Sequence, residues 1–180
     1  VVIMAICSVA VCSADERSQS VLRSVAGYVQ ALGEYGAEFD VVAGDYRTNG
    51  RYGVLGDTYH IEVAQAEVYS DGKARYEVDH DRREVNIDVM DLASRNILDN
   101  PTRCFDFVGD DYSAQIYSET GGNVTLLLRA NDVAIEGDIY LTVDSATGRP
   151  RKIAYVLYDD RIEVTIVSLE RRKNAVKRYD

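Results

Sequence analysis

The side chains best suited to catalysis in this 180-residue sequence are its two histidines and Cys104. His60 alternates with apolar neighbours, which places it on the polar side of a predicted strand, and His80 stands between Asp79 and Asp81 in a turn-like run. Both histidines are therefore expected to be solvated. Cys104 has no histidine in its own segment, so we interpret it as a small buried hydrophobe rather than a nucleophile. The sequence predicts no catalytic residue, and we expect the protein not to be an enzyme.

Paired carboxylates are a second group that could do chemistry, by binding calcium or by hydrolysing glycosides. Two such pairs, Asp110 with Asp111 and Asp159 with Asp160, fall between strand-like segments where solvated turn residues are expected. Most other acidic residues alternate with apolar ones and are predicted on the outer face of a sheet. The sequence contains no phosphate loop, zinc-ligand spacing or dinucleotide fingerprint. We therefore expect no metal site and no cofactor.

The charge of the chain limits its partners. The net charge is −10 at pH 7, the pI is near 4.7, and the acidic residues are spread along the whole chain. No basic face is available to neutralise phosphates, so we expect no nucleic acid as a partner. The same charge disfavours anionic lipid headgroups, but it does not act on a neutral acyl chain. An acylated ligand is compatible with this composition.

The first residues have the composition of a signal peptide. Residues 1–14 are uncharged and mostly apolar, and charged residues follow directly. This stretch is shorter than the roughly 20 apolar residues that a membrane span needs. We predict a leader over residues 1–14, with cleavage after Ala14 or after Ala10, and one mature domain over residues 15–180 in the periplasm. A buried helix is the alternative role of this stretch.

The predicted leader also determines how the three cysteines are interpreted. Cys7 and Cys12 fall inside it, so Cys104 stands alone in the mature part and no internal disulfide is expected. Cys12 is a candidate for lipid attachment, although Val11 stands where such sites have a small residue. The sequence lacks an initiating methionine and a basic start, which predicts that it begins inside its reading frame.

The mature part is predicted to be one mainly β domain that begins with a helix. Thirteen tyrosines and many valines and isoleucines favour strands. Before Gly33, apolar residues recur at helical spacing and predict an amphipathic helix that carries Val21, Leu22, Val25, Tyr28, Val29 and Leu32. One apolar stripe of this helix must be covered.

From Tyr35 onward the apolar period changes to two, which predicts half-buried strands. They are expected around residues 37–41, 59–63, 67–70, 75–78, 84–89, 113–118, 124–129, 139–143, 153–157 and 162–166. Tight turns are predicted at Asp71 with Gly72, at Gly121 with Gly122 and at Gly148. Between residues 90 and 111 the alternation stops, and we predict two short helices there, with Pro101 at a first helical position.

So many strands with one apolar face should curl, because twist accumulates from strand to strand. We predict an α+β, mainly β fold, namely an unclosed antiparallel β-barrel (half-barrel) covered by the N-terminal helix and a short helical lid. The residues expected to line a hydrophobic cavity and its lid are Leu22, Val25, Val29, Phe39, Val41, Tyr59, Ile61, Val78, Leu98, Phe105 and Phe107. Packing in a filled core is their alternative role. In this register Glu38, His60 and Glu62 face away from the cavity.

Several short motifs resemble the outer-membrane lipoprotein carrier family, the LolA-like proteins. The motifs are Tyr35-Gly36-Ala37-Glu38-Phe39, then Gly50-Arg51-Tyr52, then Gly56-Asp57-Thr58-Tyr59-His60-Ile61-Glu62, then Val68-Tyr69-Ser70-Asp71-Gly72-Lys73, and finally Glu84-Val85. The resemblance covers residues 18–110 and continues more loosely to the end. Its most specific part is the run from Ser70 to Lys73 at this distance from the strand that contains Phe39.

The resemblance implies an unclosed barrel with a helical lid and no cofactor. It implies a periplasmic carrier that holds the acyl chains of a lipoprotein, or another lipid, in its cavity and moves this cargo from the inner to the outer membrane. Its implied partners are an inner-membrane donor complex and an outer-membrane acceptor, and we expect a monomer. The alternative is a lipid-sensing or lipid-binding module of the same fold without a transport role.

The sequence departs from the family pattern in three places. Gly56 stands where well-studied carriers have an arginine that fastens the lid, so this lock does not carry over. Ala74 and Arg75 follow Lys73, where the family often has an apolar residue and a tryptophan. The sequence also stops at Asp180, where such relatives continue, which predicts a truncated end.

Overall fold

The structure, a computed structural model, describes residues 7–178 as one helix and eleven strands. The elements in chain order are α1 (Cys7–Leu32), β1 (Tyr35–Ala43), β2 (Tyr46–Leu55), β3 (Thr58–Val63), β4 (Ala66–Ser70), β5 (Ala74–Asp79), β6 (Glu84–Val89), β7 (Tyr112–Thr120), β8 (Asn123–Ala130), β9 (Asp138–Asp144), β10 (Pro150–Leu157) and β11 (Asp160–Arg171). All strands belong to one antiparallel sheet in the order β6-β5-β4-β3-β2-β1-β11-β10-β9-β8-β7.

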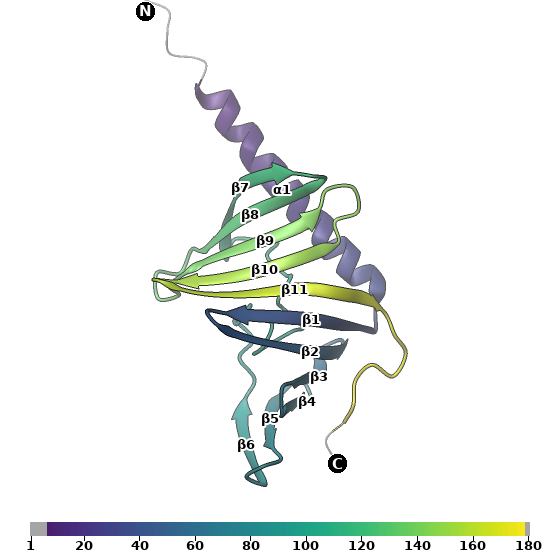
Figure 1. The fold of residues 1–180 in the computed structure, drawn as a ribbon. Coiled ribbons are helices and arrows are strands. Elements are labelled where there is room, and N and C mark those ends of the chain that lie inside the picture. Colours follow the sequence, from purple (N-terminus) through teal and green to yellow (C-terminus); the bar gives the residue numbers. More distant parts are fainter. Residues whose placement is uncertain (1–6, 179–180) are drawn as a thin grey trace, which may run out of the picture.

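The sheet consists of two meanders that meet in its middle. Strands β1 to β6 pair in sequence order, as do β7 to β11, and the pairing of β1 with β11 joins the two sets. The sheet stays open because β6 and β7 are edges without a partner strand among the described residues (Figure 1). The predicted fold class, mainly β with an unclosed antiparallel barrel, is confirmed.

Helix α1 crosses one face of the sheet obliquely, and we call this face the inner face (Figure 1). Its predicted end is confirmed, since the helix stops at Leu32 and Gly33 takes a φ of 68°, where a side chain would be strained. The helix begins at Cys7, so it continues through the boundary between the predicted leader and the mature domain. Residues 1–6 of the predicted leader lie outside the described residues. No helix in the described part of the chain meets the length and hydropathy needed to cross a membrane.

All strands predicted from alternation are present, but β2 was not predicted. Residues 47–51 of this strand read Arg-Thr-Asn-Gly-Arg, and its burial is continuous only over residues 52–54. A strand with a polar first half carries no period-two signal, so its pairing to β1 and β3 comes from the sheet rather than from its own pattern.

The segment between β6 and β7, residues 90–111, forms turns rather than the two predicted short helices. Asparagine side chains accept hydrogen bonds from the backbone two residues later, Asn96 from Leu98 N–H at 2.9 Å and Asn100 from Thr102 N–H at 3.2 Å. Such local bonds compete with helical ones, which explains why the helices do not form. We call this segment the plug, because its apolar side chains enter the core.

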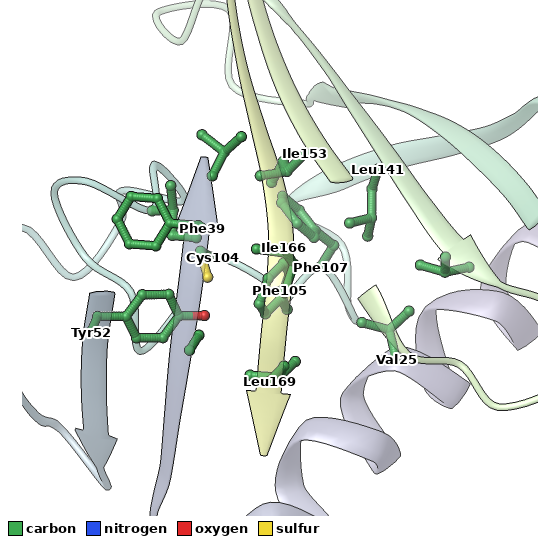
Figure 2. Packing of buried hydrophobic residues seen from close by; sticks show 14 of the residues in the cluster. Val25, Phe39, Tyr52, Cys104, Phe105, Phe107, Leu141, Ile153, Ile166 and Leu169 are labelled. Atoms are coloured by element: carbon green, nitrogen blue, oxygen red, sulfur yellow. The ribbon is translucent and has the colours of Figure 1, made fainter. Parts of the chain in front are cut away.

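The core lies between the inner face, α1 and the plug. Figure 2 shows Cys104, Phe105 and Phe107 of the plug among side chains of the sheet, such as Phe39 and Ile153. Cys104 is fully buried, as predicted, and its thiol donates a hydrogen bond to the carbonyl oxygen of Pro101 at 3.3 Å. Burial raises the pKa of this thiol, which keeps it protonated and unreactive.

Candidate functional site

The residues predicted to line the cavity gather on the inner face, with one exception. Buried in one cluster are Leu22, Val25, Phe39, Val41, Tyr59, Ile61, Phe105 and Phe107, and Val29 and Leu98 are partly buried against it. The helical stripe, the strand alternation and the plug therefore converge as predicted. Their role in binding a ligand stays a prediction.

Val78 is the exception, and its predicted position was wrong. In the pairing of β3, β4 and β5, Ile61 lies opposite Val68 and Val68 opposite Glu77, which puts Glu77 on the inner face. Val78 points the other way and lies opposite Glu67. Alternation within β5 shows only that Val78 and Glu77 face opposite sides, and the apolar side of this strand is the outer one.

Two tyrosines of the sheet fasten the plug. The Tyr59 hydroxyl donates a hydrogen bond to the Asp99 carbonyl oxygen at 2.8 Å. The Tyr155 hydroxyl donates to the Arg95 carbonyl oxygen at 3.0 Å and accepts from the Ile97 N–H at 2.8 Å. Burial raises the pKa of both tyrosines, so each hydroxyl keeps the proton that it donates.

Arg95 holds the plug together from inside. Its side chain is buried and donates to the carbonyl oxygen of Asp106 at 2.6 Å and to that of Ala93 at 2.9 Å. It also pairs with Asp111 at 3.4 Å. Sequence reasoning missed Arg95 and Tyr155, because Arg95 stands in a run of mixed polar and apolar residues and its burial follows from contacts made only in the folded plug.

A small cavity opens where α1 meets the plug. Its volume is about 160 Å³, and its lining includes Ala26, Val29, Tyr35, Pro101 and Phe105. Ligand sites in proteins commonly measure about 300 to 1,000 Å³, so this opening is too small for a long acyl chain. The structure therefore shows the plug seated, and a large apolar ligand would have to displace its side chains.

The outer face of the same strands is covered by residues 172–178, which we call the C-terminal segment. It passes over Gly53 of β2 so closely that a Cβ atom there would lie 1.9 Å from the Ala175 carbonyl oxygen. Further along, Lys177 contacts the Glu62 carboxylate, which Arg51 contacts as well. Glycine at position 53 therefore allows the segment to lie flat on the sheet.

His60 lies beneath this region and is buried, so the prediction that it is solvated was wrong. Its side chain does point to the outer face, as its register requires, but the ring stacks on Tyr69 with centroids 4.5 Å apart. Burial lowers the pKa of His60, against the opposing effect of Glu62, so the ring is neutral at pH 7. Glu38 is exposed and Glu62 half-buried on the same outer face, as predicted.

The comparisons with known proteins concern the fold. No sequence-family model and no curated protein sequence matches the chain. Among solved structures, an uncharacterised conserved protein of Thermus thermophilus superposes with a TM-score of 0.60 over 91% of this chain and 94% of its own, at 11% identity. A domain of Vibrio parahaemolyticus described as outer-membrane lipoprotein-sorting superposes with a TM-score of 0.51 over 89% of this chain and 94% of its own, at 10% identity. The chain therefore shares its fold with these two structures.

In this chain the plug is fastened without the arginine in whose place Gly56 stands. Gly56 lies in the turn between β2 and β3, and hydroxyl groups of Tyr59 and Tyr155 hold the middle of the plug instead. The structural match to the domain described as lipoprotein-sorting confirms, at the level of fold, the resemblance noted in the sequence.

Proposed function

We propose that this protein binds the acyl chains of a lipoprotein or another lipid between the inner face of its sheet and the plug, and that it does so in the periplasm. The supporting observation is the construction of the plug. Its apolar side chains fill the core, yet its backbone forms no strand with the sheet, and the middle of the plug is anchored to the sheet by the hydroxyls of Tyr59 and Tyr155.

Displacement of the plug is physically reasonable because an acyl chain would replace one set of apolar contacts by another. The burial of Phe105 and Phe107 contributes to stability, and an acyl chain in the same space restores the loss of apolar contact. The plug keeps most of its own hydrogen bonds when it moves as a unit, since those of Arg95 are internal. The opening beside Val29 and Phe105 is the natural point of entry.

We further propose that the protein is a carrier and not an enzyme, with a membrane donor and an outer-membrane acceptor as partners. The shared fold with the domain described as lipoprotein-sorting supports this role. A lipid-sensing module of the same fold is the competing function, and it would bind the same ligand without passing it on.

Native mass spectrometry of protein purified from the periplasm tests the proposal. We expect a co-purified lipid or acylated peptide in the wild type and a reduced amount in Phe105→Ala. Incubation of the loaded protein with outer-membrane vesicles then separates the two roles, because a carrier transfers its ligand and a sensor retains it. A protein that carries no lipid and does not bind a fluorescent fatty acid would contradict the proposal.

A further inference from the structure

A second cluster of chemically active side chains lies on the outer face, opposite the plug. His60 and Glu62 point to the same side of β3, and Glu67 of β4 lies directly opposite Glu62. His60 Nε2 lies 3.6 Å from Glu62 Oε1 and 4.0 Å from Glu67 Oε1. One imidazole nitrogen and two carboxylate oxygens therefore converge on one point, with their ligand atoms all within 4.8 Å of one another.

His60 itself indicates that this point binds a ligand. Its side chain is only 4% exposed, and Nε2 is buried without a hydrogen-bond partner. A buried polar atom without a partner is costly, and such atoms are uncommon in folded proteins. The orphan nitrogen faces the two carboxylates, so a cation placed between them would satisfy all three groups at once.

The spacing and chemistry fit a transition metal better than calcium. Tetrahedral zinc has bonds of about 2.0 to 2.2 Å to nitrogen and oxygen, which sets neighbouring ligand atoms about 3.4 Å apart. The observed separations of 3.6 and 4.0 Å are close to this value. Calcium takes six to eight oxygen ligands and does not favour imidazole. Zinc binds both histidine nitrogen and carboxylate oxygen, and catalytic zinc sites have three protein ligands with a fourth position left open.

His80 supports one of the ligands. Its Nε2 lies 3.0 Å from Glu67 Oε2, the oxygen that does not face His60. A group that hydrogen-bonds the far side of a ligating carboxylate fixes its orientation and typically changes metal affinity about 10- to 100-fold.

Two basic side chains already contact the Glu62 carboxylate, and they determine how metal binding would act on the fold. Arg51 and Lys177 both contact its carboxylate. A divalent ion at the same place repels both, and Lys177 is the easier to displace because it belongs to the C-terminal segment and is 53% exposed. Metal binding would thus displace Lys177 from Glu62, while the Ala175 N–H of the same segment stays bonded to Glu34 Oε1 at 2.8 Å.

We propose that His60, Glu62 and Glu67 form a zinc-type metal site on the outer face, and that Lys177 competes with the metal for Glu62. The site is separate from the plug and does not depend on the proposed acyl binding. The sequence shows no metal-ligand motif here, because the three ligands come from two strands and meet only through the pairing of β3 with β4.

Calorimetric titration of the untagged protein with Zn²⁺ alone tests the site. The protein carries Cys7→Ala and Cys12→Ala, which remove competing thiols. We expect one saturable site, at least tenfold weaker in His60→Gln and in Glu67→Gln, and severalfold tighter in Lys177→Ala. Cobalt in place of zinc should give a visible absorption band that His60→Gln abolishes.

Glu163→Gln is the matched control, since Glu163 also lies between a lysine and an arginine, Lys152 and Arg161, but has no histidine beside it. It should leave zinc affinity unchanged. If His60→Gln does not fold, Glu67→Gln decides alone, because that side chain is partly exposed. Equal zinc affinity in the wild type and Glu67→Gln would overturn the proposal, as would the absence of saturable binding in both the wild type and Lys177→Ala.

Discussion

The two sides of strand β3 are both shielded from water, but they are covered by different means. On the inner side, Tyr59 and Ile61 lie under the plug, which is held by apolar side chains and a few hydrogen bonds. On the outer side, His60 and Glu62 lie near the C-terminal segment, which is held by the ion pair of Lys177 with Glu62 and by hydrogen bonds from its backbone to Glu34. The plug should therefore respond to apolar ligands, whereas the C-terminal segment should respond to salt and metal ions.

The largest expected effect on stability comes from a substitution on the inner face of the sheet. Leu141 of β9 is fully buried, so Leu141→Ala should lower the free energy of unfolding by about 2 to 5 kcal/mol through lost burial and a new cavity. Denaturant titration measures this loss, and the affinity of the folded fraction for a fluorescent fatty acid should not change. A loss well below this range would show that the sheet core is not tightly packed.

Phe105→Ala separates the plug from that core. In a static core this change would cost about 3 to 5 kcal/mol. For a plug that opens we expect a smaller loss of stability than for Leu141→Ala, together with weaker binding of the fatty-acid probe. The unfolding midpoint and the probe affinity are measured on the same samples. Large destabilisation with unchanged affinity would refute the plug as a moving lid.

Tyr155→Phe tests the hydrogen bonds that anchor the plug to the sheet. It removes the acceptor of the buried Ile97 N–H and the donor to the Arg95 carbonyl, which should cost about 1 to 3 kcal/mol. We expect the probe to enter faster in stopped-flow fluorescence, because the seated plug loses an anchor. Tyr117→Phe, at an exposed tyrosine of β7, is the control and should change neither quantity. Unchanged entry in Tyr155→Phe would mean that this tyrosine does not limit opening.

Lys177→Ala makes the corresponding change on the outer side. Lys177 is exposed, and ion pairs near the surface contribute about 0 to 1 kcal/mol, so stability should fall little and the difference from the wild type should vanish at high salt. The C-terminal segment should become more sensitive to limited proteolysis, with cleavage followed by mass spectrometry. If binding of the fatty-acid probe changed as well, the plug and the C-terminal segment would be coupled rather than independent.

Asp144, the last residue of β9, gives a reference away from both the plug and the C-terminal segment. Hydrogen bonds from Arg151 and then from Thr147 lower the pKa of its carboxyl to about 2 from an ordinary 3.8. Because the folded-state pKa is depressed, its contribution is fully present above pH 3.8 and is lost as the pH falls towards 2. Asp144→Asn should thus be slightly less stable than the wild type at pH 7, and in denaturant titrations the difference should shrink as the pH falls and disappear below pH 2. A difference of undiminished size below pH 2 would assign the effect to something other than this charge.

The sequence was informative wherever one face of an element is apolar and the other polar. Val21 to Leu32 predicted the end of α1, and Phe39, Tyr59 and Ile61 predicted which side of β1 and β3 is buried. It failed for Val78, because alternation is symmetric and does not show which side of a strand faces the core. In β5 and β6 the apolar side faces outward, and Ile87 is left 64% exposed.

The other failures came from contacts between distant segments. His60 was expected in solvent because its strand neighbours are apolar, yet Tyr69 and the region of the C-terminal segment bury it. The plug was expected to be helical because Leu98 and Phe105 are apolar and Pro101 can begin a helix, but the asparagines there bond their own backbone. Such outcomes depend on tertiary partners and local side-chain bonds that periodicity does not record.

The pairing of β1 with β11 has a consequence for how the chain folds. Each meander is built from neighbours in sequence and can form by local hairpins, whereas the central pair joins the first strand of the domain to the last. Closing so long a loop is entropically expensive, so this step should be late and should limit the folding rate. On the ribosome the sheet remains in two halves until residue 171 emerges, and during that time β1 is a bare edge open to aggregation.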